Sequence, residues 1–237
     1  MRKLFITDIH GQYKEMIALL EAAQYQPGVD TLIVGGDMID RGPDSAHVLR
    51  QLKSLQERYP EQVIVLMGNH EDMMGQFLAG INNMWFSHGK EAIESFDREF
   101  NDTEFDEYLS WAISRPWIHE DDEYVYVHAG IHPTRPLDEQ NRQECLWMPY
   151  SQSGIRFEQY DKDLILECTG NRKVVYGHTP KNYIFDDGSR MCCDLGSAVK
   201  PDAKLALVDL TNDSYWYYDF TTSEITSRKI ARKKVVA

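Results

Sequence analysis

Five short apolar runs in this chain each end directly in a cluster of glycine and polar residues, and this pattern limits the possible folds more than any other feature. The clusters lie between residues 8 and 178 and are Asp8-Ile9-His10-Gly11, Gly36-Asp37-Met38-Ile39-Asp40-Arg41-Gly42, Gly68-Asn69-His70-Glu71, His128-Ala129-Gly130 and Gly177-His178-Thr179. In an open α/β sheet, functional residues gather outside the carboxyl ends of the strands. The five clusters are therefore expected to converge on one site.

The first 70 residues alternate between buried strands and amphipathic helices. Strands are predicted at Lys3–Thr7, Thr31–Val34 and Val63–Leu66, because these runs are short and nearly all apolar. Two helices are predicted between them from apolar residues at helical spacing, namely Tyr13, Met16, Ile17 and Leu20, then Val48, Leu49, Leu52 and Leu55. This β-α-β-α-β order predicts a parallel sheet that is buried on both faces.

The remainder of the chain is predicted to be helical over about residues 71–120, with an irregular loop near the mouth of the site from Pro133 to Asp163. Further strands are predicted at Tyr124–Val127 and Val174–Tyr176. The last third is predicted to form a second, largely antiparallel sheet from Met191–Leu195, Leu205–Leu210, Tyr215–Phe220 and Ile225–Ile230. With no repeat or linker visible, residues 1–237 are predicted to form one α/β domain.

The composition indicates a soluble cytoplasmic protein. No stretch approaches the roughly 20 apolar residues of a membrane span, and the N-terminal segment reaches charged Asp8 too early for a secretory signal. We therefore expect no membrane partner. The cysteines, Cys145, Cys168, Cys192 and Cys193, show no regular spacing and are predicted to be free thiols in a reducing compartment.

The chain is acidic, with 25 basic and 38 acidic residues and a net charge of −13. This balance argues against nucleic-acid binding, which usually needs a basic face. The basic residues near the C-terminus are predicted to form a solvated tail rather than a binding patch; they are Arg228, Lys229, Arg232, Lys233 and Lys234. An acidic protein that handles phosphate needs local positive charge, and bound metal ions are one way to supply it.

Six residues in the strand-end clusters are candidate metal ligands, and all offer oxygen or imidazole donors: Asp8, His10, Asp37, Asn69, His128 and His178. This donor set suits two divalent ions, with Mn preferred and Fe or Zn as alternatives. A shared carboxylate must hold the pair together, and Asp37 is the natural bridge because it lies between the two groups of ligands. The other histidines, His47, His88, His119 and His132, are assigned to the surface or to structural roles.

The motifs D-x-H-G, G-D-x-x-D-R-G, G-N-H-E, H-A-G and G-H-T-P, in this order, resemble the phosphoprotein phosphatase branch of the metallophosphoesterases, especially its bacterial and lambda-phage-type members. The segments Met84–Lys90 and Asp194–Ala198 resemble two further motifs of that family. The resemblance implies a four-layer α/β/β/α sandwich. It also implies that Asp8, His10 and Asp37 hold one metal, and that Asp37, Asn69, His128 and His178 hold the other.

The same resemblance implies the roles of the remaining residues. A metal-bridging hydroxide would attack the phosphorus, and His70 would be the general acid that protonates the leaving alkoxide, oriented by Asp40. Arg41 would grip the phosphate oxygens, and Asn69 would also lie at the substrate phosphate. The family usually has a second arginine two residues after a tryptophan, but Pro149 stands there after Trp147. Arg156 or Arg135 would have to replace it.

Three functions remain open from the sequence. The first is hydrolysis of phosphate monoesters, on phosphoserine or phosphothreonine proteins or on small molecules. The second is hydrolysis of dinucleoside polyphosphates such as diadenosine tetraphosphate, which relatives with similar motifs cleave. Symmetrically cleaving relatives tend to lack the carboxylate at the position of Asp40, which this chain retains, although some asymmetrically cleaving relatives keep it. The third is a degenerate scaffold, which predicts a lost ligand, yet every expected ligand and His70 are present.

Overall fold

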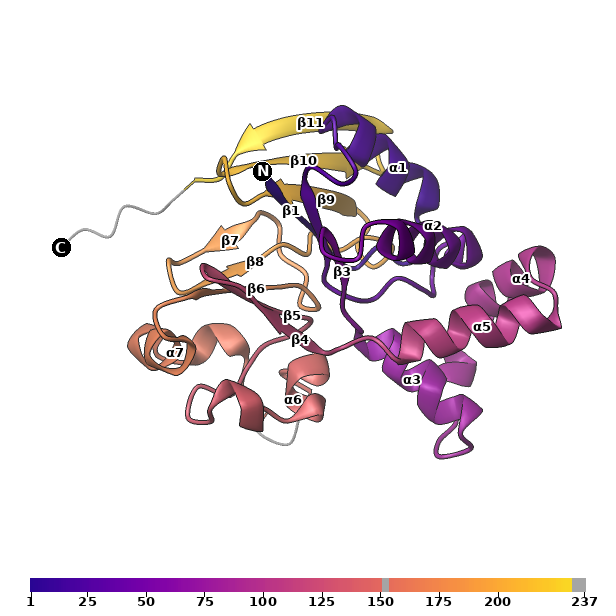
Figure 1. The fold of residues 1–237 in the computed structure, drawn as a ribbon, viewed down its shortest axis with the longest axis horizontal. Helices are drawn as coiled ribbons and strands as arrows, with labels where there is room; N and C mark the ends of the chain where they lie inside the picture. The colour runs from indigo at the N-terminus through magenta and orange to yellow at the C-terminus, as the bar shows by residue number, and fades with distance from the viewer. Residues whose placement is uncertain (151–153, 232–237) are drawn as a thin grey trace.

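The structure is a computed structural model and describes residues 1–150 and 154–231. Its strands form two sheets (Figure 1). The first has six strands in the order β11-β10-β9-β1-β2-β3, with bounds β1 (Lys3–Ile6), β2 (Thr31–Val34), β3 (Val63–Val65), β9 (Lys204–Asp209), β10 (Ser214–Asp219) and β11 (Glu224–Lys229). The second has five in the order β4-β5-β6-β8-β7, with bounds β4 (Ile118–Glu120), β5 (Tyr124–Val127), β6 (Lys173–Tyr176), β7 (Phe185–Asp186) and β8 (Arg190–Cys192).

The N-terminal β-α-β-α-β prediction is confirmed. Strands β1, β2 and β3 pair in parallel, and helices α1 (Tyr13–Ala22) and α2 (Ser45–Arg58) connect them. The carboxyl ends of these strands therefore lie at one edge of the first sheet.

The prediction that the last strands form a second sheet of their own is wrong. Strand β9 pairs with β1 in antiparallel register, with Phe5 opposite Val208, so β9, β10 and β11 extend the first sheet. The segment Met191–Leu195 does not join them either, because β8 pairs in parallel with β6 in the second sheet. A sequence pattern shows that a segment is a strand, but its partner depends on contacts that only the folded chain makes.

Alternating side chains show how the sheets stack. Along β1, Leu4 and Ile6 pack into one core with α1 and α2, whereas Phe5 packs into a second core between the sheets. Along β5, Tyr126 contributes to that same central core, and Val125 and Val127 face a third core. Successive residues of a strand point to opposite faces, so both sheets are covered on both sides.

Helices α6 (Arg142–Trp147) and α7 (Lys162–Thr169) cover the outer face of the second sheet, with Cys145 and Ile165 in the third core. The layers are therefore helices, sheet, sheet and helices (Figure 1). This confirms the predicted four-layer α/β/β/α sandwich.

The site lies where the carboxyl edges of the two sheets meet, because the clusters after β1, β2, β3, β5 and β6 are in contact there.

The region from 71 to 120 is mainly helical as predicted, with α3 (Asn69–Leu78), η1 (Met84–Ser87), α4 (Lys90–Glu99) and α5 (Asp102–Ile113), but its last residues form β4. The predicted loop from Pro133 to Asp163 is wrong in part. It contains the short turns η2 (Leu137–Glu139) and η3 (Phe157–Gln159) and all of α6, and it includes the first residues of α7. These elements were not predicted because each is short and only partly buried, so the segment shows a mainly polar composition.

The cysteines are free, as predicted, and Cys145, Cys192 and Cys193 are buried. Within the described residues, no helix is long and apolar enough to cross a membrane. Of the basic residues near the C-terminus, Arg228 and Lys229 belong to β11 rather than to a tail. Arg232, Lys233 and Lys234 lie outside the described residues.

Candidate active site

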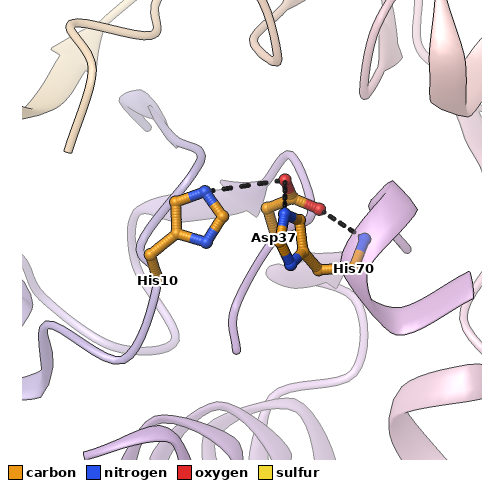
Figure 2. A group of neighbouring side chains, drawn as sticks. All are labelled: His10, Asp37 and His70. Carbon is orange, nitrogen blue, oxygen red and sulfur yellow. Dashed lines mark hydrogen bonds and ion pairs between the residues drawn. The ribbon is translucent and has the colours of Figure 1, made fainter. Parts of the chain in front are cut away.

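Asp37 occupies the centre of the site, and three imidazole rings face its carboxylate. The Asp37 Oδ2 atom lies 3.7 Å from His10 Nε2, 3.9 Å from His70 Nε2 and 3.4 Å from His128 Nε2. Figure 2 shows the rings of His10 and His70 directed at this carboxylate from the loop after β1 and from the start of α3. All four side chains are almost completely buried.

Two groups of side chains have the spacing of metal ligands. One comprises His10, Asp37 and His70, and the other comprises Asp37, His128 and His178; within each group, the candidate ligand atoms lie within 4.8 Å of one another. Asp37 belongs to both. In addition, His178 Nε2 is buried and has no hydrogen-bond partner among the described residues, which is costly unless another ligand uses its lone pair.

The tautomers of two of these histidines follow from their second nitrogen. His10 Nδ1 lies 3.0 Å from the Ile39 carbonyl oxygen, and His128 Nδ1 lies 2.8 Å from the Gly35 carbonyl oxygen. A carbonyl only accepts, so each Nδ1 carries hydrogen and each Nε2 faces Asp37. A lone pair on Nε2 would repel this carboxylate, so the arrangement requires a cation, which in the metal-free protein is the Arg41 guanidinium at His10 and a proton at His128. The residues therefore fit a metal site.

The ionisation of the protein groups agrees with this requirement. Burial lowers the pKa of His128, but the neighbouring Asp37 and Asp8 carboxylates outweigh it and raise that pKa to about 10. Burial also lowers the pKa of His178, to about 3, and adjacent His128 adds to the effect. Burial alone would raise the pKa of Asp37, yet His128 and His70 hold it well below its usual range. A proton on His128 thus supplies positive charge that a metal ion would otherwise provide.

The other two predicted ligands lie at the same place. Asn69 Oδ1 is 2.9 Å from His128 Nε2. Asp8 Oδ2 accepts hydrogen bonds from Thr7 Oγ1 at 2.7 Å and from the His178 backbone nitrogen at 3.0 Å. The structure therefore brings all six predicted ligands together, although Asp8 and Asn69 are in neither group of three.

His70 and Asp40 form a buried pair beside the candidate metal ligands. His70 Nδ1 donates to Asp40 Oδ2 at 2.6 Å, and Trp85 Nε1 lies 3.0 Å from each oxygen of the same carboxylate. Burial raises the pKa of Asp40, while its bond to His70 opposes that change. With Nδ1 fixed in this way, His70 directs Nε2 into the site.

The arginines differ in their access to the site. The Arg41 guanidinium donates to His10 Nε2, so its planar fork reaches the candidate ligands. Arg135 is instead paired with Glu144 through Nη1. His88, predicted for the surface, is exposed, but its ring centroid lies 6.3 Å from that of His70, so it stands at the rim of the site.

Glu71 is a structural part of the site that the sequence did not identify. Its fully buried carboxylate accepts hydrogen bonds from the backbone nitrogens of Asp37, Met38, Ile39 and Gly68, at 3.0, 2.8, 3.2 and 2.8 Å. It therefore joins the loop after β2 to the loop after β3. Its place in the G-N-H-E cluster was the available signal, but the pattern of its contacts exists only in three dimensions.

The backbone of the site is strained. Six non-glycine residues of the site have φ between 48° and 72°, in the left-handed region: Asp8, His10, Asp37, Asp40, Arg41 and His178. Residues persist in this region when the surrounding structure compels it, and such strain is concentrated at functional sites. Gly68 is required for a different reason, because a Cβ atom there would lie 2.1 Å from Asp37 Oδ1.

Comparison with known proteins assigns the family. The model of the calcineurin-like phosphoesterases matches residues 1–207, which include every residue of the site. The chain belongs to the calcineurin-like phosphoesterase family. The cluster of oxygen and imidazole donors around Asp37 agrees with this assignment.

Two curated relatives of this chain carry the same name. The symmetrical bis(5′-nucleosyl)-tetraphosphatase of Klebsiella pneumoniae (strain 342) is 35% identical over 147 residues, which cover 61% of this chain and 48% of the relative. The protein of the same name from Escherichia coli (strain K12 / DH10B) is 36% identical over 147 residues, with the same coverage. The chain thus spans about half the length of these relatives.

Solved structures confirm the fold of the chain. A protein described as a candidate diadenosine tetraphosphatase superposes with a TM-score of 0.66 at 21% identity, covering 98% of this chain and 95% of the other. A protein serine/threonine phosphatase from Saccharomyces cerevisiae superposes with a TM-score of 0.67 at 18% identity, covering 100% and 82%. These neighbours act on different substrates, so the fold they share does not select among them.

Proposed function

We propose that this phosphoesterase hydrolyses dinucleoside polyphosphates of the diadenosine tetraphosphate kind. The observation that carries the proposal is the 35–36% identity to symmetrical bis(5′-nucleosyl)-tetraphosphatases over 147 residues. This reverses the ranking expected from the sequence, which placed phosphate monoesters first.

The centre proposed for this reaction holds two divalent ions that share Asp37. His10 and Asp8 complete one side, and Asn69, His128 and His178 complete the other. The spacing of the two groups that contain Asp37 supports this assignment, as does the buried, unpartnered Nε2 of His178. Because the donors are oxygen and imidazole, Mn, Fe and Zn all suit the centre. When bound, the ions neutralise charge on the phosphoryl oxygens and lower the pKa of a coordinated water.

The chain's own side chains bind and orient the substrate. Arg41 reaches the ligand cluster and would contact two phosphate oxygens through its planar fork. His70 would donate a proton from Nε2 to the leaving oxygen, because its Nδ1 is committed to Asp40. Glu71 keeps Asp37 in position by binding its backbone nitrogen and those of its neighbours.

Hydrolysis of phosphate monoesters is the second candidate, and the buried pair of His70 and Asp40 favours it. An alkoxide leaving group has a high pKa and gains much from protonation, whereas a nucleotide leaving through a phosphate oxygen gains little. A complete acid pair is therefore more useful to an esterase.

A turnover panel distinguishes the two candidates. Metal-loaded enzyme is assayed with diadenosine tetraphosphate, a phosphoserine peptide and p-nitrophenyl phosphate, each with Mn, Fe or Zn. A kcat/KM for diadenosine tetraphosphate at least tenfold above both monoesters is expected. The products, separated by chromatography, should be two molecules of ADP if cleavage is symmetrical. Faster turnover of a monoester with every metal would reject the proposal in favour of the second candidate.

A further inference from the structure

A cavity of about 600 Å³ opens at the seam between the two sheets. Its walls come from the β7 edge of the second sheet, from the start of α7 and from the paired ends of β10 and β11. Its volume falls within the roughly 300–1,000 Å³ of small-molecule sites.

Strand register places one wall of this cavity away from the active site. Ser214 pairs with Asp209, and Asp209 pairs with Leu4, so the first residue of β10 lies level with the amino end of β1. The candidate metal ligands follow the carboxyl end of β1 and the strands parallel to it. β10 and β11 are also separated from β1 by β9 (Figure 1). Among the described residues that line the cavity there is no candidate metal ligand, so the cavity is distinct from the active site.

The acidic residues of the cavity wall are already neutralised. Asp186 is paired with Lys173 at 2.8 Å, Asp187 with Arg190 at 2.9 Å, and Glu158 with Lys181 at 2.7 Å. Each carboxylate has a cation of its own, so these residues contribute little net charge to the space.

Two cations of the wall have no such partner. Lys162 Nζ donates to the Asp187 carbonyl oxygen at 3.0 Å, and the Arg228 guanidinium lies 5.5 Å from the centre of the Tyr217 ring. Neither forms an ion pair with a carboxylate of residues 1–150 or 154–231. Lys229 follows Arg228 on β11, so its side chain points to the opposite face of the sheet, where Nζ donates to the Asn212 carbonyl oxygen at 3.1 Å. A cavity with net positive charge in a protein of net charge −13 would attract an anion.

Aromatic rings supply the rest of the wall. Tyr183 is 57% exposed, so its ring is available for stacking, and Phe185 and Tyr215 add further apolar surface. We propose that this cavity binds a small anion that carries a flat ring, of the mononucleotide class, with its phosphate at Lys162 and Arg228 and its ring against Tyr183.

The location is tested with 8-bromo-AMP soaked into crystals of the metal-loaded full-length protein. Anomalous scattering from bromine should appear in the cavity beside Tyr183. A bromine signal only at the metal centre, or no signal at millimolar ligand, would overturn the proposal.

Affinity is tested by calorimetric titration of the full-length protein with AMP. The double variant Lys162→Ala and Arg228→Ala should weaken cavity binding at least tenfold and leave kcat/KM of phosphoester hydrolysis unchanged. Tyr183→Ala, at an exposed position that cannot disturb the core, should weaken it severalfold with an unchanged melting temperature. Inorganic phosphate and adenosine should each bind more weakly than AMP, since each provides only half of the contacts.

A matched control removes the same charge elsewhere, through the exposed residues Lys14 and Arg58, both changed to Ala. This control should bind AMP as the wild type does. Equal losses in the control and in the cavity variant would show a general effect of net charge and would reject the site.

Discussion

His70 Nδ1 lies 2.6 Å from Asp40 Oδ2, and both side chains are almost completely buried. Trp85 also donates to this carboxylate, so Asp40 has little freedom to turn away. The pair therefore fixes the direction in which His70 Nε2 points, and the first prediction tests that function.

His70→Ala should lower kcat by about 10²–10⁴-fold on substrates with poor leaving groups, the range for a lost general acid. The loss should shrink for p-nitrophenyl phosphate, because p-nitrophenolate needs little protonation. Metal content, measured by plasma mass spectrometry, should stay at the wild-type level. Loss of one ion would instead make His70 a ligand, as its spacing from His10 and Asp37 also permits. His119→Ala, on β4, is the control.

Asp37→Asn should reduce the occupancy of both metal ions, because Asp37 belongs to both groups of candidate ligands. The amide keeps the size of the side chain but removes its negative charge, so the effect reports on charge rather than packing. Two ions retained in full would eliminate the bridging role. Asp97→Asn, at an exposed position on α4, should leave metal content unchanged.

Glu71→Gln should lower the free energy of unfolding by about 1–3 kcal/mol and reduce metal content. Glutamine places an NH₂ group where a carboxylate oxygen now accepts backbone N–H bonds, so at least one buried donor loses its acceptor. Chemical denaturation and metal analysis provide the two measurements. The exposed Glu94→Gln is the matched control, and equal stability of the two variants would contradict the positioning role.

Arg41→Ala should raise KM and lower kcat together, with a combined loss of about tenfold to hundredfold, which corresponds to about 1.5–3 kcal/mol for a hydrogen bond to a charged group. Arg135→Ala should remain close to wild type, because Arg135 is already paired with Glu144. Steady-state kinetics of both variants on one substrate check the prediction. A comparable loss in Arg135→Ala or Arg156→Ala would reveal the substitute arginine.

Metal binding should release protons at pH 7. The pKa of His128 is raised to about 10 in the metal-free protein, so its ring is protonated and must lose a proton to bind an ion. Calorimetric titration in buffers of different ionisation enthalpy counts the protons released, and a titration that releases no protons would contradict this prediction.

In the chelated protein, the contribution of protonated His128 to the free energy of unfolding should be complete below its ordinary pKa of 6.5 and should be lost as the pH rises toward 10.

The sequence by itself determined the local elements of the first half of the fold and the identity of the candidate site residues. The apolar periodicity predicts strand β1 and helix α1, and the predicted bounds agree with the observed ones within a few residues. The clusters around Asp8, Asp37 and His70 follow strands that pair in parallel, so their convergence was predictable without coordinates.

Tertiary structure alone decided which strands share a sheet and what holds the site rigid. The pairing of β1 with β9 joins residues about 200 positions apart, and local patterning carries no information on such partners. Glu71 is a comparable case, since any buried glutamate in a helix shows the same local pattern. Its four backbone donors come from two separate loops, and they meet its carboxylate only after β2 and β3 have paired.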